Sequence, residues 1–210
     1  MADSAGAGYS SDWISEAGLD LDAGYCITFV RGVGPREALH RLGVSDAAIR
    51  NATWTEFTAQ NDQRELTRLI PGVAAAFVMG AHVVLVEDIG YWGRLPEWAK
   101  PVSRGTETLN VYLSPTSLVE ELSIYRDGKR VAFVSGDEPE VIEGSDADLA
   151  GRLIELTFEA LQPWNENDAA PEDFSYGRVD LLQVACGYLG LQPEAPDISG
   201  PVLGALVEYR

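Results

Sequence analysis

Residues 120–134 read EELSIYRDGKRVAFV and place the dipeptide Asp127-Gly128 between two strand-like runs. Asp-Gly is a preferred pair for the two-residue type I′ turn of a β-hairpin, because both turn positions need a positive φ. In the first run Leu122 and Ile124 alternate with polar residues, which is the period of a strand with one buried face. The segment therefore predicts an antiparallel hairpin with strands at 120–126 and 129–134.

A second hairpin is expected nearer the N-terminus. Two apolar runs, 73–79 and 82–88, are joined by Gly80-Ala81, and glycine in the first loop position suits a type II′ turn. Compact apolar runs at 25–30 and 106–113 predict two further strands. Most of the predicted strands are thus joined by short turns, which favours antiparallel pairing.

Helical patterns lie between and after these strands. Pro35 is suited to open a helix that runs to Leu42, and a later helix is indicated by one apolar face of Leu149, Leu153, Leu156 and Ala160. Ser145 and Asp148 form an approximate capping box at the start of the later helix, and an acidic loop is expected at 163–175. Together these elements predict an α+β fold, a mainly antiparallel sheet with helices packed on one face. Residues 1–11 have little to pack and are expected to form a flexible N-terminal tail, and residues 12–210 a single α+β domain.

The charge balance excludes several classes of partner. The chain carries 33 acidic and 15 basic residues, a net charge of −18, whereas phosphate binding needs clustered Lys and Arg. We therefore expect no nucleic acid and no membrane as a partner. No apolar run reaches the roughly 18 residues of a membrane span, and no secretory signal pattern is present, so a cytoplasmic location is expected.

Familiar catalytic patterns are missing from the sequence. Gly32-Val33-Gly34 is followed by Glu37 where the dinucleotide fingerprint needs glycine, and the two histidines lie in no metal-binding motif. No Gly-x-Ser-x-Gly elbow occurs. The sequence therefore predicts no catalytic residues, no metal site and no cofactor.

One dense group of chemically distinctive residues stands out. Glu87 and Asp88 end a predicted strand, Tyr91 and Trp92 follow in a glycine-bordered turn, and Arg104 comes shortly after. These five residues are the candidate partner-binding site, because Tyr, Trp and Arg dominate interface energetics. The alternative is an anchored turn in which Trp92 fills the core and a guanidinium locks the carboxylates.

The acidic residues are concentrated toward the C-terminus. Residues 137–180 hold 13 acidic residues and two arginines. This segment is either a solvated surface or an electrostatic attractor for a basic partner, and steering of that kind weakens with salt.

Several segments in order resemble a family known chiefly from actinobacterial genomes and catalogued as a domain of unknown function. The resemblance rests on Tyr25–Gly32, Arg41–Gly43, Glu87–Gly93, Ser103–Thr106 and Leu191–Glu194. It departs at Leu113–Thr116 and Ser135–Pro139, and it implies no activity, substrate or cofactor.

The expected function is a non-catalytic acidic protein-binding module, immunity-like or an adaptor, that engages another protein, a basic one if charge steers the encounter. The alternative is a small-molecule enzyme or ligand sensor that uses acidic residues near Glu87 and Asp88. That alternative predicts buried carboxylates with raised pKa values beside a pocket.

Overall fold

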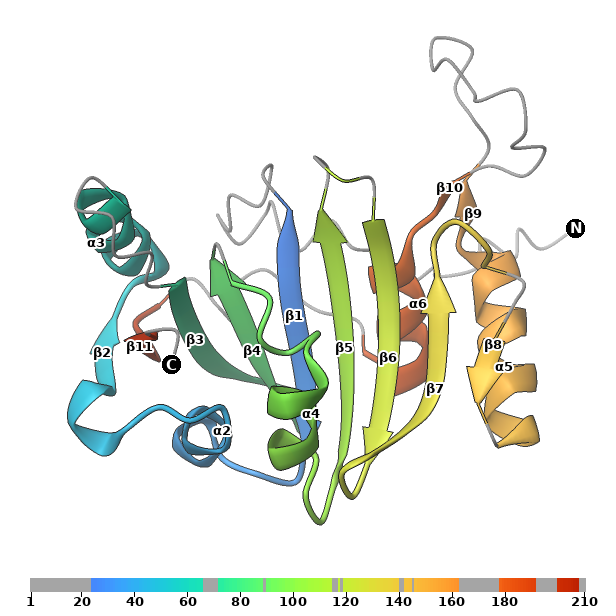
Figure 1. Ribbon diagram of the computed structural model, residues 1–210, viewed down its shortest axis with the longest axis horizontal. Coiled ribbons are helices and arrows are strands. Elements are labelled where there is room, and N and C mark those ends of the chain that lie inside the picture. Colours follow the sequence, from blue (N-terminus) through green and yellow to red (C-terminus); the bar gives the residue numbers. More distant parts are fainter. Residues whose placement is uncertain are drawn as a thin grey trace, which may run out of the picture.

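The computed structural model describes residues 24–65, 72–88, 90–114, 117, 119–139, 142–144, 146–162, 178–191 and 200–207. Nine of the described strands form one antiparallel sheet, and their bounds are β1 Tyr25–Arg31, β2 Arg50–Ala52, β3 Gly72–Met79, β4 His82–Asp88, β5 Glu107–Ser114, β6 Val119–Arg126, β7 Lys129–Ser135, β8 Ile142–Gly144 and β11 Val202–Val207. Their order across the sheet is β2-β11-β3-β4-β1-β5-β6-β7-β8 (Figure 1). Two short strands, β9 (Leu161–Gln162) and β10 (Arg178–Val179), form a separate pair.

Helices cover both faces of the large sheet. On the front face in Figure 1 lie α2 (Pro35–Arg41) and α4 (Pro96–Val102), and α6 (Leu181–Leu189) lies behind the sheet. The apolar core is accordingly divided into two clusters, one with the α2 residue Leu39 and one with the α6 residue Leu182. The helices α3 (Trp54–Glu65) and α5 (Ala147–Glu159) contribute Phe57 and Leu153 to the cluster that contains Leu182.

The mainly antiparallel sheet confirms that part of the predicted fold, but the expectation of helices on one face does not match this arrangement. Along β4, Val83 and Leu85 belong to the front cluster, and Val84 and Val86 belong to the rear cluster. A central strand buried on both faces needs a continuous apolar run, whereas alternation marks a strand with one wet face. The unbroken apolar run 83–86 therefore indicated burial on both faces. The alternation at 120–126 predicted one buried face, but Ser123 and Tyr125 of β6 are buried as well as Leu122 and Ile124.

The predicted hairpins form with the expected turns. Asp127 has φ 47° and Gly128 has φ 76°, the pair of positive values that a type I′ turn requires. Gly80 has φ 58°, and β3 pairs with β4 from Met79–His82 to Val73–Asp88. These two turns join strands that lie on opposite sides of the central strand β1.

The structure corrects the predicted start of the α5 helix. Asp146 is its N-cap and accepts a hydrogen bond from the Leu149 N–H at 3.1 Å, whereas the sequence favoured a capping box of Ser145 and Asp148. Ser145 lies outside the described residues, as do the predicted tail at 1–11 and the predicted acidic loop at 163–175. Among the described helices, none is long and apolar enough to span a membrane.

The Asp127-Gly128 turn yields a stability prediction. Gly128→Ala places a Cβ on a residue in the left-handed region and should lower the free energy of unfolding by about 1 kcal/mol. Urea denaturation monitored by circular dichroism measures the change. Gly151→Ala is the matched control: it lies on an exposed face of α5 with open space around a new Cβ, and should raise stability by about 0.5–1 kcal/mol. A loss of stability in both variants, or in neither, would contradict the assigned turn geometry.

Candidate functional site

Glu87 is the most unusual titratable residue of the predicted site, because it lies at the end of β4 with only 1% of its surface exposed. Its Oε2 accepts a hydrogen bond from the Trp92 N–H at 2.6 Å, and its Oε1 accepts one from the Gly93 N–H at 2.8 Å. The carboxyl group thereby holds the backbone of the turn that follows its own strand.

Polar side chains from the next two strands of the sheet, β1 and β5, complete this buried cluster. The register places Cys26 of β1 opposite Glu87, and the Cys26 thiol donates to Glu87 Oε1 at 3.5 Å. The Asn110 amide on β5 donates to Thr28 Oγ1 at 2.8 Å and to the Cys26 sulfur at 3.3 Å. The cluster therefore joins three adjacent central strands through side chains as well as through the sheet ladder.

The cluster leaves room only for glycine at position 93. A Cβ on Gly93 would lie 2.6 Å from Asn110 Nδ2 and 3.0 Å from Glu87 Oε1, and closer still to the Thr28 hydroxyl. Such contacts are too short for non-bonded atoms, so any side chain would push the turn away from the sheet. The close approach of this backbone lets its N–H groups reach the Glu87 carboxylate.

Burial controls the protonation of both Glu87 and Cys26. Desolvation raises the pKa of Glu87 from 4.5 to about 7, although the hydrogen bonds from Gly93 and Trp92 oppose that rise. Desolvation, followed by the nearby charge of Glu87, raises the pKa of the Cys26 thiol well above its ordinary value. Cys26 is therefore a protonated donor within the cluster, and it lacks the thiolate character of a reactive cysteine.

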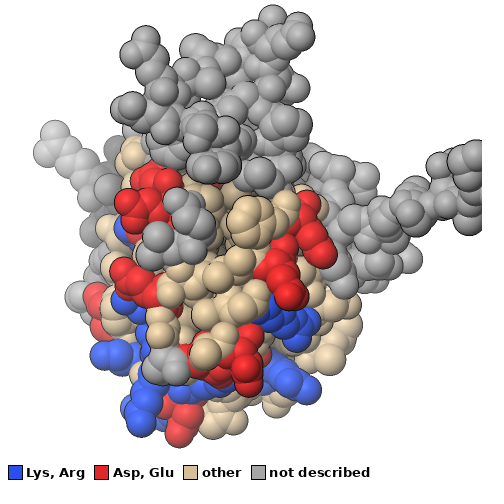
Figure 2. Space-filling model, turned by 90° about the vertical axis from the view of Figure 1, so that its right-hand side faces the viewer, with Lys and Arg blue, Asp and Glu red and all other residues tan. Residues whose placement is uncertain are grey.

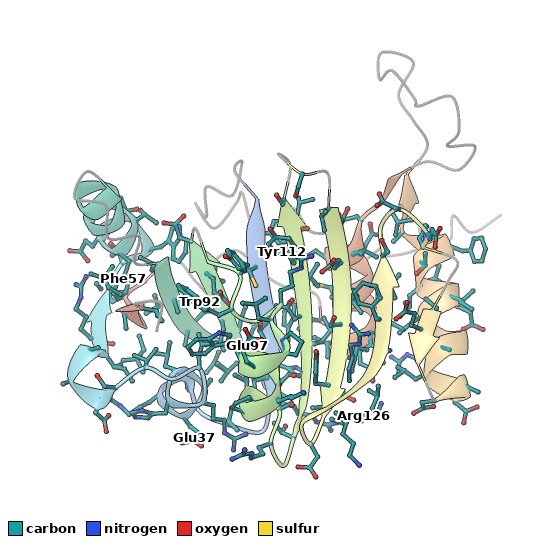
Figure 3. The ribbon with its side chains drawn as sticks, in the orientation of Figure 1. Glu37, Phe57, Trp92, Glu97, Tyr112 and Arg126 are labelled. Atoms are coloured by element: carbon teal, nitrogen blue, oxygen red, sulfur yellow. The ribbon has the colours of Figure 1, made fainter. Side chains whose placement is uncertain are left out.

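The structure separates the five predicted site residues into three environments. Glu87 and Trp92 are buried, and the Trp92 ring packs against Gly72 of β3 (Figure 3). Asp88 is partly exposed and Tyr91 is 40% exposed. Trp92 therefore lies in the core, as the alternative interpretation of the sequence expected. Because Glu87 and Trp92 are both buried, neither side chain offers a surface to a partner.

Arg104 and Glu87 lie near opposite ends of the strands. Two residues after it, the Thr106 hydroxyl donates to the carbonyl of Arg31, and Arg31 pairs with His82 at the beginning of β4. Glu87 is near the end of that strand. Arg104 therefore does not lock Glu87, whose carboxylate instead accepts hydrogen bonds from the backbone N–H groups of Trp92 and Gly93.

The structure also reveals an apolar stripe on α5 that sequence reasoning missed. Phe158 is 64% exposed, Ala147 and Gly151 are exposed, and Ile154 is partly exposed. Their spacing of four, three and four residues places them on one side of a helix. The helical spacing of these four residues is visible in the sequence. The sequence analysis nevertheless assigned the apolar face of the helix from Leu149 and Leu153, which form the stronger apolar pattern.

A row of carboxylates runs beside the α5 stripe. Asp148, Glu155 and Glu159 are exposed and share a second side of the helix between the stripe and the buried face. Figure 2 faces this end of the molecule and shows red acidic side chains around a tan area, with blue Lys and Arg side chains mainly in the lower half of the view. The stripe and the row together, hereafter the α5 outer face, combine apolar area with negative charge.

The α5 outer face is presented on a helix that polar contacts attach to the sheet. Arg126 of β6 donates to Asp146 Oδ2 at 2.9 Å, to the Tyr188 hydroxyl at 3.1 Å and to Glu107 Oε2 at 2.5 Å. One guanidinium thus connects two strands with the N-cap of α5 and with α6. Because the helix is anchored, binding at its outer face would require little ordering of the backbone.

Titration of Glu87 should make stability depend on pH. Its pKa is higher in the folded protein than in the unfolded chain, so the folded state binds this proton more tightly and loses stability as the pH rises from about 4.5 to about 7. Relative to Glu87→Gln, the free energy of unfolding of the unsubstituted protein should fall by about 2–3 kcal/mol between about pH 5 and pH 8.

Urea denaturation at these two pH values measures the difference. Glu97→Gln on α4 is the control, because Glu97 is exposed, and its pH profile should follow that of the unsubstituted protein. If the profile of Glu87→Gln runs parallel to both, Glu87 does not titrate between these pH values.

Comparison with known proteins identifies the family of this chain. No curated protein and no solved structure matches the sequence. Among the described residues, no group of three or more His, Cys, Asp or Glu side chains is placed to hold a metal ion. The family model described as "Family of unknown function (DUF6461)" matches residues 7–175 of the 210, and the chain therefore belongs to the DUF6461 family.

Proposed function

We propose that the protein is a non-catalytic, acidic protein-binding module that engages a basic partner protein through the α5 outer face. The observation that carries this proposal is the apolar stripe of Ala147, Gly151, Ile154 and Phe158, bordered by carboxylates. An immunity-like or adaptor role is consistent with such a surface, since both roles need shape and charge and neither needs bond-making groups.

The α5 helix has more apolar surface than its packing uses. Leu149, Leu153 and Thr157 are buried against the sheet side, whereas Phe158 lies on a different face with 64% of its surface exposed. A surface helix ordinarily has one apolar face toward the core and a polar face toward water. A second apolar stripe that ends in an aromatic residue is typical of a helix that also contacts a partner.

The charge of the outer face favours a basic partner. Arg152 is the one basic residue of α5, and it is engaged within the molecule: its Nη2 donates to the Tyr188 carbonyl at 2.8 Å and its guanidinium lies 5.0 Å from the Tyr188 ring centroid. Among the charged residues of α5, the carboxylates of Asp148, Glu155 and Glu159 therefore lie nearest the stripe. Complementary charge accelerates encounter and selects among partners.

The alternative function, a small-molecule enzyme or ligand sensor at Glu87 and Asp88, has one observation in its favour. Burial raises the pKa of Glu87 to about 7, a value suited to proton transfer. Both carboxyl oxygens, however, accept hydrogen bonds from the turn that they hold, and the side chain is 1% exposed. This geometry supports a structural role for Glu87 and leaves partner binding as the better-supported proposal.

The proposal is tested by affinity capture from the native cell with paired variants. Phe158→Ser and the double variant Glu155→Gln/Glu159→Gln should each weaken capture of a basic protein by about tenfold or more, because an aromatic anchor and its flanking charge are lost. Binding is quantified with the captured partner after purification. Raising the salt concentration should weaken the complex as well, since exposed charges are screened.

The matched control variants change exposed residues on β3 and α4, away from α5. Val78→Ser replaces an apolar residue that is 55% exposed on β3, and Glu97→Gln removes an exposed acid on α4. Both variants should retain the partner. If no basic protein is captured at low salt, or if all four variants bind it equally, the α5 outer face is not the binding surface.

A further inference from the structure

We propose that a cavity on the front face of the sheet binds a small, uncharged bicyclic aromatic molecule. The cavity has a volume of about 340 Å³ and lies between the segment after α2, the 3₁₀ helix η1 (Asp46–Ala48), α4 and β11. The helices α2 and α4 lie in front of the sheet (Figure 1). This inference does not depend on the α5 outer face, because β11 lies near the β2 end of the sheet and α5 packs against β8 at the other end.

The walls of the cavity favour an uncharged ligand. They come from four separate segments of the chain, and all of their residues are uncharged. A charged group placed there would lose its hydration without gaining a counter-charge. The side chains that form the walls are Val44, Ser45, Ala48, Trp98, Leu206 and Val207.

The charged side chains of α2 and η1, which border the cavity, are engaged with one another. Arg36 Nη1 donates to Asp46 Oδ1 at 2.7 Å, and His40 Nε2 lies 3.0 Å from the same oxygen. Arg41 Nε donates to Glu37 Oε1 at 2.9 Å. These contacts direct the charges of both helices toward each other, which further favours a ligand without charge.

The volume and the polar groups of the cavity define the ligand more closely. A dry cavity of about 150 Å³ holds one benzene ring, so about 340 Å³ leaves room for two fused rings. Trp98 contributes an aromatic wall, and aromatic pairs are favourable both when offset-stacked and when edge-to-face. The Ser45 hydroxyl makes no capping hydrogen bond at the start of η1 and is available to one polar group on the ligand.

The cavity wall is held in place by contacts within the protein. Gly43 has φ 86°, and a Cβ on it would lie 2.8 Å from a ring carbon of Trp98, so this ring lies directly on the backbone of residue 43. The Val44 N–H donates to the Leu39 carbonyl at 3.0 Å, and the Val44 carbonyl oxygen lies 2.9 Å from His40 Nδ1. Because the wall is preformed, a ligand would bind without a large cost of ordering.

The test uses 2-naphthol, an uncharged molecule of two fused rings with one hydroxyl group, and the unsubstituted full-length protein. Calorimetry should detect binding. The anion 2-naphthoate and the cation 2-naphthylmethylammonium should each bind more weakly by about tenfold or more, because the cavity offers no counter-charge. Using both signs of charge separates the chemistry of the cavity from the net charge of −18.

The position of the bound naphthol is measured by NMR on the same protein. Nuclear Overhauser contacts should connect the naphthol ring protons with the methyl groups of Ala48, Leu206 and Val207, which line the cavity. Phenol, which has one ring, should make the same contacts and bind more weakly, because it buries less apolar surface.

Two adjacent alanines of η1 provide a matched pair of variants. Ala48 lines the cavity and packs against the front cluster, whereas Ala47 is exposed and lies outside the lining. Ala48→Phe should therefore fill the cavity and weaken naphthol binding by about tenfold or more, and Ala47→Phe should leave it unchanged. Circular dichroism checks that both variants are folded.

The proposal is overturned if the unsubstituted protein does not bind 2-naphthol, if either charged analogue binds as tightly, or if the Overhauser contacts lie outside the cavity. Equal binding by folded Ala48→Phe and Ala47→Phe would also overturn it. If Ala48→Phe does not fold, the ligand series and the Overhauser contacts decide, since both are measured on the unsubstituted protein.

Discussion

A buried carboxylate at the centre of the sheet connects the strands to the layer in front of them. Glu87 accepts hydrogen bonds from the backbone of Trp92 and Gly93, and the turn can approach so closely because residue 93 has no side chain. Trp92 then fills the front cluster together with Leu39 of α2 and Val102 of α4. The desolvation of one acid is thus offset by local hydrogen bonds and by the packing of a tryptophan that those bonds position.

The two ends of the sheet differ in structure, and the proposed binding surface lies at the β8 end. At the β8 end, α5 is anchored through Asp146 and Arg126 and turns an apolar stripe with Phe158 outward among carboxylates. At the other end, β2 pairs only with Val202–Gly204 of β11, and a cavity lined in part by Trp98 opens beside β11. The surface on α5 suits a basic partner protein.

Local turn chemistry explains which parts of the fold were predictable. Asp127-Gly128 and Gly80-Ala81 each specify a two-residue turn through their own backbone preferences, so both hairpins and the antiparallel character of the sheet followed from short segments. The number of covered faces did not follow, because it depends on where helices far apart in the chain return to the sheet. The helix start at Asp146 was missed for a smaller reason, since adjacent capping residues compete within one turn.

The amino-acid sequence by itself determined the six central strands of the sheet, the main hairpin turns, the acidic character and the two aromatic residues of the candidate turn. Only the tertiary structure decided that Glu87 points inward, because its environment is built by Cys26, 61 residues away, and by Asn110, which in turn bonds Thr28 across 82 residues. Tertiary packing likewise decided which apolar residues of α5 are buried and which are exposed. Periodicity and turn preferences act over a few residues, whereas burial and pKa depend on contacts between distant segments, and those contacts exist only once the sheet has formed.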